Sequence, residues 1–155
     1  MDAEILEGLV KVNGIDIWKE YGVFLTEKKK GGNDNLKAIT RASKVKSHVG
    51  VDIREENGRK YPQKLVVKNE ERDVTLHFAL IADTKELWWQ KYRAFIQFIK
   101  QGNDGWVHFA FIEIGLTLKM FYVDSSEPEP LTCLWKQGKH ASRFKIKFRE
   151  PNPIL

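Results

Sequence analysis

The sequence has a single cysteine among its 155 residues, which excludes a disulfide within the chain. This residue, Cys133, lies in the apolar run Leu131–Trp135, where we expect a strand and a buried thiol. A catalytic thiol would need a nearby base and an electropositive pocket, and no neighbouring residue supplies either. Cysteine usage of this kind is compatible with a cytoplasmic protein.

Long hydrophobic runs are also missing. A membrane-spanning helix needs about 18 or more apolar residues in succession, and no such stretch occurs. The first residues, Met1–Ile5, carry acidic side chains and no long apolar run, which is unlike a secretory signal peptide. We therefore expect no membrane span and synthesis as a soluble cytoplasmic chain.

The common motifs of catalysis and metal binding are absent as well. There is no GxSxG, GxxxxGK[ST] or GxGxxG pattern. None of the four histidines forms an i,i+4 pair, and no cysteine pair joins them, so no metal site is expected. The sequence thus predicts a protein that is not an enzyme and has no cofactor. Were it an enzyme, His77 and His108 would be the first candidates for titrating groups in a polar pocket.

The chain does contain enough apolar material for one packed domain, residues 1–155. Hydrophobic residues make up 42% of it and aromatic residues 12%, as is typical of a globular protein. The net charge is +5 and the isoelectric point is about 9.2. This balance is compatible with a nucleic-acid partner or an acidic protein surface, and it specifies neither.

Alternation of apolar and polar residues predicts most of the strands. The clearest examples are residues 74–80, 106–114, 116–123 and 144–148, each with a period of two. Near the N-terminus, Asn13-Gly14 is a strong hairpin signal, because both residues tolerate the positive φ angles of a tight turn. It predicts strands at residues 9–12 and 15–18 on its two sides, followed by a short strand at residues 22–26.

A single amphipathic helix is predicted between the strands at 74–80 and 106–114. Aromatic and aliphatic residues recur at helical spacing from Trp88 to Ile99. The preceding Asp83–Glu86 resembles a capping box, with Asp83 as the cap, and Gly102 ends the helix. The sum is a mainly β (α+β) fold: an antiparallel β-sandwich or distorted barrel with one flanking α-helix at about 84–101.

The middle of the chain has a different character. Residues 27–49 are rich in lysine, glycine and turn-forming residues, and they predict a flexible basic loop. Within this loop, Lys28–Asn35 is expected to bury nothing. Strands are predicted at residues 49–53 and 63–68, with a turn at residues 55–59.

Two basic clusters favour an alternative function. One follows the loop from Lys28 to Lys46, and the other is a strand face formed by Lys145, Lys147 and Arg149. Such stripes can follow a phosphate backbone, although neither carries the exposed aromatic side chains that single-strand binders use. The two clusters therefore indicate a monomeric basic nucleic-acid-binding module as the alternative function of the chain.

The order of elements resembles the N-terminal domain of phage distal tail proteins, within the wider tail-tube family. The likeness consists of a small hairpin and strand at the start, a strand before the helix, a strand pair after it, and a closing strand with a proline just beyond. The residues that carry it are Val12–Asp16, Tyr21–Leu25, Arg72–Phe78, Thr84–Gln101, Trp106–Val123, Ala141–Phe148 and Pro151.

This resemblance implies a structural protein of a phage or prophage tail, made in the host cytoplasm and then incorporated into the virion. Members of the family assemble as rings, commonly hexameric, around the channel through which DNA passes, and they contact other tail or baseplate proteins. Many distal tail proteins carry a larger C-terminal domain that this sequence does not contain. The sequence is consistent with three classes of protein, namely a short distal tail form, a tail-tube subunit and a related secretion-tube protein.

Ring closure would pair exposed strand edges, and a long loop would reach the neighbouring subunit. Residues 27–49 are the candidate loop, and we predict that deleting Lys28–Asn35 loosens assembly without unfolding the monomer. The residues predicted at the subunit interface are Lys28, Lys29, Lys30, Asn33, Leu36, Ile39 and Arg41.

Overall fold

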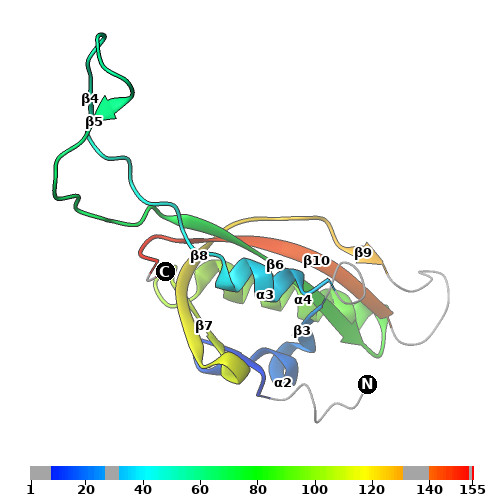
Figure 1. The fold of residues 1–155 in the computed structure, drawn as a ribbon. Coiled ribbons are helices and arrows are strands. Elements are labelled where there is room, and N and C mark those ends of the chain that lie inside the picture. The colour runs from blue at the N-terminus through cyan, green and yellow to red at the C-terminus, as the bar shows by residue number, and fades with distance from the viewer. Residues whose placement is uncertain (1–7, 27–31, 131–139, 154) are drawn as a thin grey trace.

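The computed structural model describes residues 8–26, 32–130, 140–153 and 155. One antiparallel sheet dominates them, with the strand order β2-β1-β7-β8-β10-β6-β3 and with β9 paired to β10. Figure 1 shows this sheet curling from β6 and β10, through β8, to β7 below. The predicted antiparallel β-rich fold is therefore confirmed, in the form of one sheet curled into half a barrel.

The strands of the sheet differ greatly in length. The central pair, β6 and β10, stays in register over eleven residues each, and Phe144 lies opposite Phe78 near its middle. The strands of the sheet are β1 Val10–Val12, β2 Ile15–Asp16, β3 Val23–Leu25, β6 Arg72–Ala82, β7 Val107–Phe111, β8 Leu116–Ser125, β9 Glu129–Pro130 and β10 His140–Glu150.

Period-two alternation puts the apolar residues of these strands on one face. In β6 the buried positions include Val74, Leu76, Phe78 and Leu80, as the sequence pattern predicts. Residues 112–114 are the exception, because β7 ends at Phe111 and a 3-10 turn, η1 (Ile112–Ile114), follows it. The predicted strand at residues 131–135, with Cys133, lies outside the described residues.

Helix α4 (Lys85–Gln101) is the predicted flanking helix and covers the apolar face of the sheet. Its buried Phe95 packs edge-on against Phe78, with the ring centroids 5.6 Å apart. The cap differs from the prediction, because the Thr84 hydroxyl, and not Asp83, accepts a hydrogen bond from the Leu87 backbone N–H. A threonine hydroxyl at the N-cap can accept a hydrogen bond from the third amide of the helix, which is also the role of an aspartate carboxylate at that position.

The predicted N-terminal hairpin is present, but its second strand is shorter than expected. β2 ends at Asp16, and residues 17–21 form the short helix α2 (Ile17–Tyr21). The Asp16 carboxylate accepts a hydrogen bond from the Trp18 backbone N–H at 3.1 Å, which caps the helix. Gly22 then ends α2 in the left-handed conformation.

Gly22 gives a direct test of this local structure. Its φ is +68°, and a Cβ atom there would lie 2.8 Å from the Ile81 carbonyl oxygen. Gly22→Ala should therefore destabilise the fold by more than the roughly 1–2 kcal/mol that a left-handed alanine costs alone. Gly14→Ala is the matched control, because φ is +83° there and no atom lies within 4 Å. Urea unfolding of both variants measures the difference, and equal losses would contradict the steric account.

The middle of the chain departs most from the prediction. Residues 34–40 form a third helix, α3 (Asp34–Thr40), inside the predicted loop. Residues 44–70 leave the body as a long projection, with a small two-stranded sheet, β4 (Val51–Asp52) and β5 (Arg59–Lys60), near its outer end (Figure 1). The strand predicted at residues 63–68 is absent, because this stretch finds no strand partner there.

Candidate subunit interface

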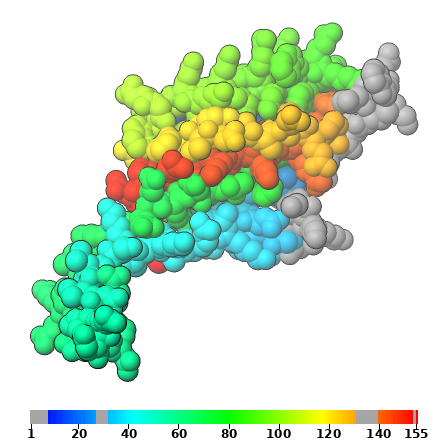
Figure 2. Space-filling model, turned by 90° about the horizontal axis from the view of Figure 1, so that it is seen from above, coloured from blue at the N-terminus to red at the C-terminus, as the bar shows by residue number. Residues whose placement is uncertain are grey.

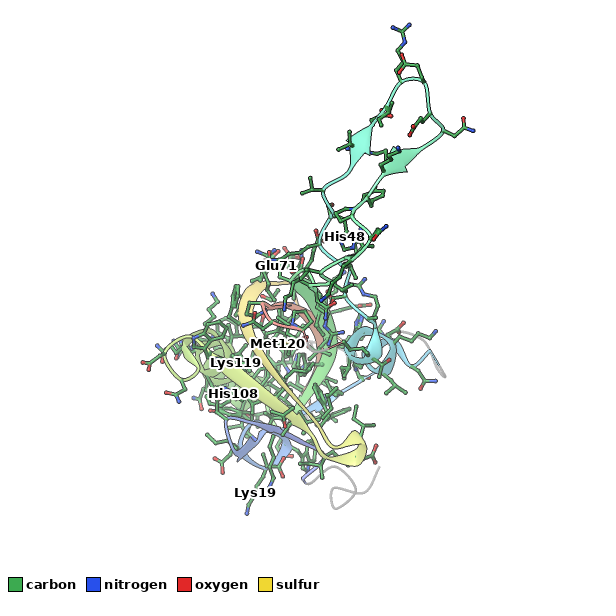
Figure 3. All side chains as sticks on the ribbon, turned by 60° about the vertical axis from the view of Figure 1, so that its left-hand side comes forward. Lys19, His48, Glu71, His108, Lys119 and Met120 are labelled. Atoms are coloured by element: carbon green, nitrogen blue, oxygen red, sulfur yellow. The ribbon has the colours of Figure 1, made fainter. Side chains whose placement is uncertain are left out.

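The projection formed by residues 44–70, which we call the arm, is the most unusual feature of the described structure. Figure 2 shows it extending well beyond the body, and Figure 3 places His48 near its base and Glu71 at its junction with the body. At the base the two chain segments run side by side: the Lys46 N–H donates to the Lys68 carbonyl and the Glu70 N–H to the Lys44 carbonyl, both at 2.7 Å. The base of the arm is thus an ordered antiparallel ribbon.

Hydrogen bonds fix this base to the end of the chain. The backbone N–H and the hydroxyl of Ser43 both donate to the Leu155 carbonyl, each at 2.9 Å. On the returning segment, the Asn69 side-chain amide donates to the Pro153 carbonyl at 3.2 Å. The body therefore sets the direction in which the arm leaves.

A buried ion pair lies beneath the same junction. Arg72 and Glu150 pair at 2.6 Å, and each side chain is only 6% exposed. The Arg72 guanidinium also donates to the carbonyls of Ile39, at 3.0 Å, and of Arg41. This one side chain thus joins the last strand, the end of α3 and the segment that leads into the arm.

The arm carries apolar side chains that the rest of the described chain does not cover. Val49 is 86% exposed and Val66 is 69% exposed, although valine is among the residues most often buried. Burying one valine or leucine fully stabilises by about 1.5–3 kcal/mol, so a partner that covers several of them gains a substantial free energy. The exposed apolar residues of the arm are Val45, Val49, Val51, Tyr61, Leu65, Val66 and Val67. A cluster of this kind is typical of a protein interaction site.

The helix α3 is held against the sheet by one amide side chain. The Asn35 Nδ2 group donates to the carbonyls of Thr26 and His77, and its Oδ1 accepts from the His77 N–H at 2.6 Å. Asn35 is buried, so the expectation that residues up to position 35 bury nothing is wrong. A deletion of Lys28–Asn35 would remove this anchor and would destabilise the monomer, contrary to the sequence-based prediction.

The residues predicted at the interface fall in three settings. Lys28, Lys29 and Lys30 lie outside the described residues. Ile39 is 4% exposed and belongs to the core of the subunit, where it holds α3. The remaining three lie at or beside α3 on the surface, with Leu36 47% exposed, and they are Asn33, Leu36 and Arg41.

An apolar groove lies beside α3. It has a volume of about 370 Å³ and is formed where β1, α2, β3, α3, the end of β7 and η1 meet. Its floor and walls are mostly aliphatic and aromatic, and Leu36 is the predicted interface residue that lines it together with Asn33 and Ile39. Glu113 adds a carboxylate to the lining. Sequence reasoning misses this groove, because its residues come from six separate elements.

The predicted basic strand face is only partly basic in the structure. Lys147 pairs with Asp73 at 3.3 Å, and Arg149 pairs with Asp73 at 2.8 Å and with Glu71 at 3.8 Å. The hydrogen bond from Arg149 is the main cause that holds the pKa of Asp73 below its ordinary value. Asp73 therefore stays ionised at neutral pH and offsets part of the positive charge that a phosphate backbone would need.

The two histidines proposed for an enzymatic alternative are not brought together. His77 lies on β6 and His108 on β7, and β8 and β10 separate these strands in the sheet. The His108 ring nitrogen Nδ1 lies 3.3 Å from the Asn13 side-chain oxygen. Within the described ranges, no group of three or more histidine, cysteine, aspartate or glutamate side chains could hold a metal ion. No helix in those ranges is long and apolar enough to cross a membrane.

Comparisons with known proteins give one informative likeness. No protein-family model matches the chain, and no curated protein sequence matches it. The fold is, however, found in one solved phage protein. The crystal structure of the SPP1 Dit protein (gp 19.1) matches it with a TM-score of 0.61 at 10% sequence identity.

The match covers 94% of this chain and 50% of Dit, so the chain spans half the length of that protein. The Dit structure is described as a paradigm of the hub adsorption apparatus in phages that infect Gram-positive bacteria. At this level of identity the likeness establishes a common fold. It agrees with the resemblance drawn from the order of elements in the sequence.

Proposed function

We propose that the chain is a structural subunit of a phage or prophage tail, and that copies of it assemble into a ring around the tail channel. The ring is hexameric and stands at the distal end of the tail or within the tail tube. Its partners are other copies of the chain and neighbouring tail or baseplate proteins, and DNA only passes through the channel. The chain is made in the host cytoplasm and ends in the virion.

The arm is the observation that carries this proposal. A fold like that of a tail hub protein accounts for the body of the subunit. It does not explain why the arm, whose base is held by hydrogen bonds, carries solvent-exposed valines. Assembly explains them, because a neighbouring subunit would cover the arm. An ordered base lowers the conformational entropy that binding costs.

Shortening the arm tests the proposal. In the variant, residues 47–67 are replaced by Gly-Gly, which joins Lys46 to Lys68 where the two segments already lie side by side. The core contains no arm residue, so the melting temperature of the monomer should change little. Assembly should be lost, as measured by light scattering behind size exclusion across protein concentration.

A control keeps the arm but changes an exposed side chain elsewhere. Trp89 is exposed on α4, and Trp89→Ala should leave assembly intact. If the arm-shortened chain forms the same large species as the parent, the arm does not hold the ring together. If it fails to fold, the far-ultraviolet circular dichroism spectrum shows this, and Val49→Asp with Val66→Asp in the intact arm replaces it.

A monomeric nucleic-acid-binding module is the alternative function. It predicts DNA affinity that falls steeply with salt, because bound cations are released from the phosphates. In the sequence, the basic face of the last strand favours this alternative. In the structure, Lys147 and Arg149 pair with Asp73, so less positive charge is left on that face to bind phosphates.

A further inference from the structure

We propose that the apolar groove receives segment 61–68 of the arm from a second copy of the chain, so that each subunit binds the next one head to tail. This inference rests on the proposed self-assembly and names the surface that performs it. The groove is the one formed by β1, α2, β3, α3, the end of β7 and η1, with Leu36 in its lining.

The chemistry of the two surfaces matches. The groove is lined mainly by apolar side chains such as Val10, Ile17 and Phe24. Segment 61–68 presents three consecutive apolar residues, Leu65–Val67, all of which are exposed. Covering them in an apolar groove removes both surfaces from water at the same time, which is the main favourable contribution in protein association.

Charge fits the same arrangement. Lys64 and Lys68 stand on the two sides of Leu65–Val67 in the sequence. The groove contributes one carboxylate, that of Glu113. An apolar centre with opposite charges at its edge is the usual composition of a protein interface.

The edge of the sheet beside the groove can also pair with an incoming segment. β3 is the last strand on its side, and the hydrogen bonds between Thr26 and His77 and between Gly22 and Ile81 fix its bonding to β6. In an antiparallel pair alternate residues bond to the neighbour, so the backbone groups of Val23 and Leu25 point away from β6. No strand in the described part of the chain pairs with this edge. Addition of a strand to such an edge is a common mode of peptide recognition.

The arm cannot fill the groove of its own subunit. Its base is fixed to the carbonyls of Leu155 and Pro153. Figure 1 shows that the arm leaves the body in the direction away from α2 and β3, which border the groove. The occupant is therefore a second molecule, and an interface between two different surfaces of one chain closes into a ring when the rotation between copies allows it.

Two charge substitutions break one side of this contact each. Val66→Asp places a carboxylate in the centre of the arm segment, and Leu36→Asp places one in the lining of the groove. Both positions are exposed in the subunit, so both variants should fold. Each variant alone should remain monomeric where the parent assembles, while Trp89→Asp, an exposed change on α4, should assemble as the parent does.

Mixing the two variants distinguishes this contact from other modes of assembly. A chain with Leu36→Asp still has an intact arm, and a chain with Val66→Asp still has an intact groove. An equimolar mixture should therefore form heterodimers, and it should stop there because the second contact is broken on both sides. Arms that bind arms, or grooves that bind grooves, would give no complementation. A mixture that behaves as two monomers overturns the proposal, even where the parent forms rings.

A peptide titration gives the answer without assembly. A fluorescein-labelled peptide of residues 60–69 should bind saturably to the arm-shortened chain, whose groove is free. It should bind at least about tenfold more weakly when that chain also carries Leu36→Asp, because a buried unpaired charge costs more than 1.4 kcal/mol. Equal binding to both proteins, or no saturable binding, overturns the proposal. A peptide of residues 1–8 that binds in a Leu36-dependent way, while the arm peptide does not bind, assigns the groove to another occupant and overturns it too.

Discussion

Replacing Glu150 with alanine is expected to lower the free energy of unfolding by about 3–5 kcal/mol. The pair with Arg72 is 2.6 Å long, and both side chains are almost fully buried. The substitution leaves the Arg72 guanidinium inside the protein without its counter-charge, and the cost of that buried charge is larger than the net value of the pair itself. Urea unfolding of the parent and the variant measures the loss.

An exposed pair supplies the control. Lys60 and Glu56 are 3.1 Å apart, but both side chains are largely in water, and Glu56→Gln should change stability by no more than about 0.5 kcal/mol. Combining Arg72→Met with Glu150→Leu should cost less than the sum of the two single changes, because the double variant leaves no unpaired charge. A loss below about 1 kcal/mol for Glu150→Ala would show that the pair does not join the arm junction to the sheet as described.

Replacing Phe95 with alanine should cost a similar amount, about 3–5 kcal/mol, through a cavity in the core. Phe95 is fully buried on α4, and its ring meets Phe78 at 5.6 Å, Tyr21 at 5.7 Å and Phe144 at 6.1 Å between centroids. Removing it therefore leaves the helix without its central contact to β6 and β10. Urea unfolding again measures the free energy.

Trp89 on the same helix is the matched comparison for Phe95. It is a larger aromatic residue, but 51% of it is exposed. Trp89→Ala should therefore cost far less than Phe95→Ala, although it removes more atoms. Comparable losses for the two variants would mean that α4 does not pack through the face that the structure assigns to it.

The sequence predicts the body well, because its strands and its long helix obey simple periodicities. β6, β8 and β10 show one buried face at a period of two, and α4 shows a stripe that includes Trp88, Phe95 and Ile99. These elements bury their apolar residues within one subunit, so the pattern and the packing agree. The order of the same elements also gives the resemblance to distal tail proteins.

The arm and the groove could not be predicted in this way. Residues 63–68 look like a strand, because Leu65–Val67 are apolar and β-branched in part, yet they have no partner in the subunit. Asn35 looks like a loop residue, but it is buried, and its side-chain amide forms hydrogen bonds with the backbone of Thr26 and His77. Both errors have one physical cause, which is that local pattern does not specify whether a neighbour from elsewhere in the fold, or from another chain, is present.

Light scattering behind size exclusion, followed by negative-stain imaging of any large peak, shows whether the chain assembles with itself. The parent chain is measured across protein concentration at two salt concentrations, beside the arm-shortened chain. We predict a ring or short tube for the parent and a monomer for the arm-shortened chain. A parent that stays monomeric at every concentration, and that binds DNA with a steep dependence on salt, would contradict the account and favour the nucleic-acid-binding module.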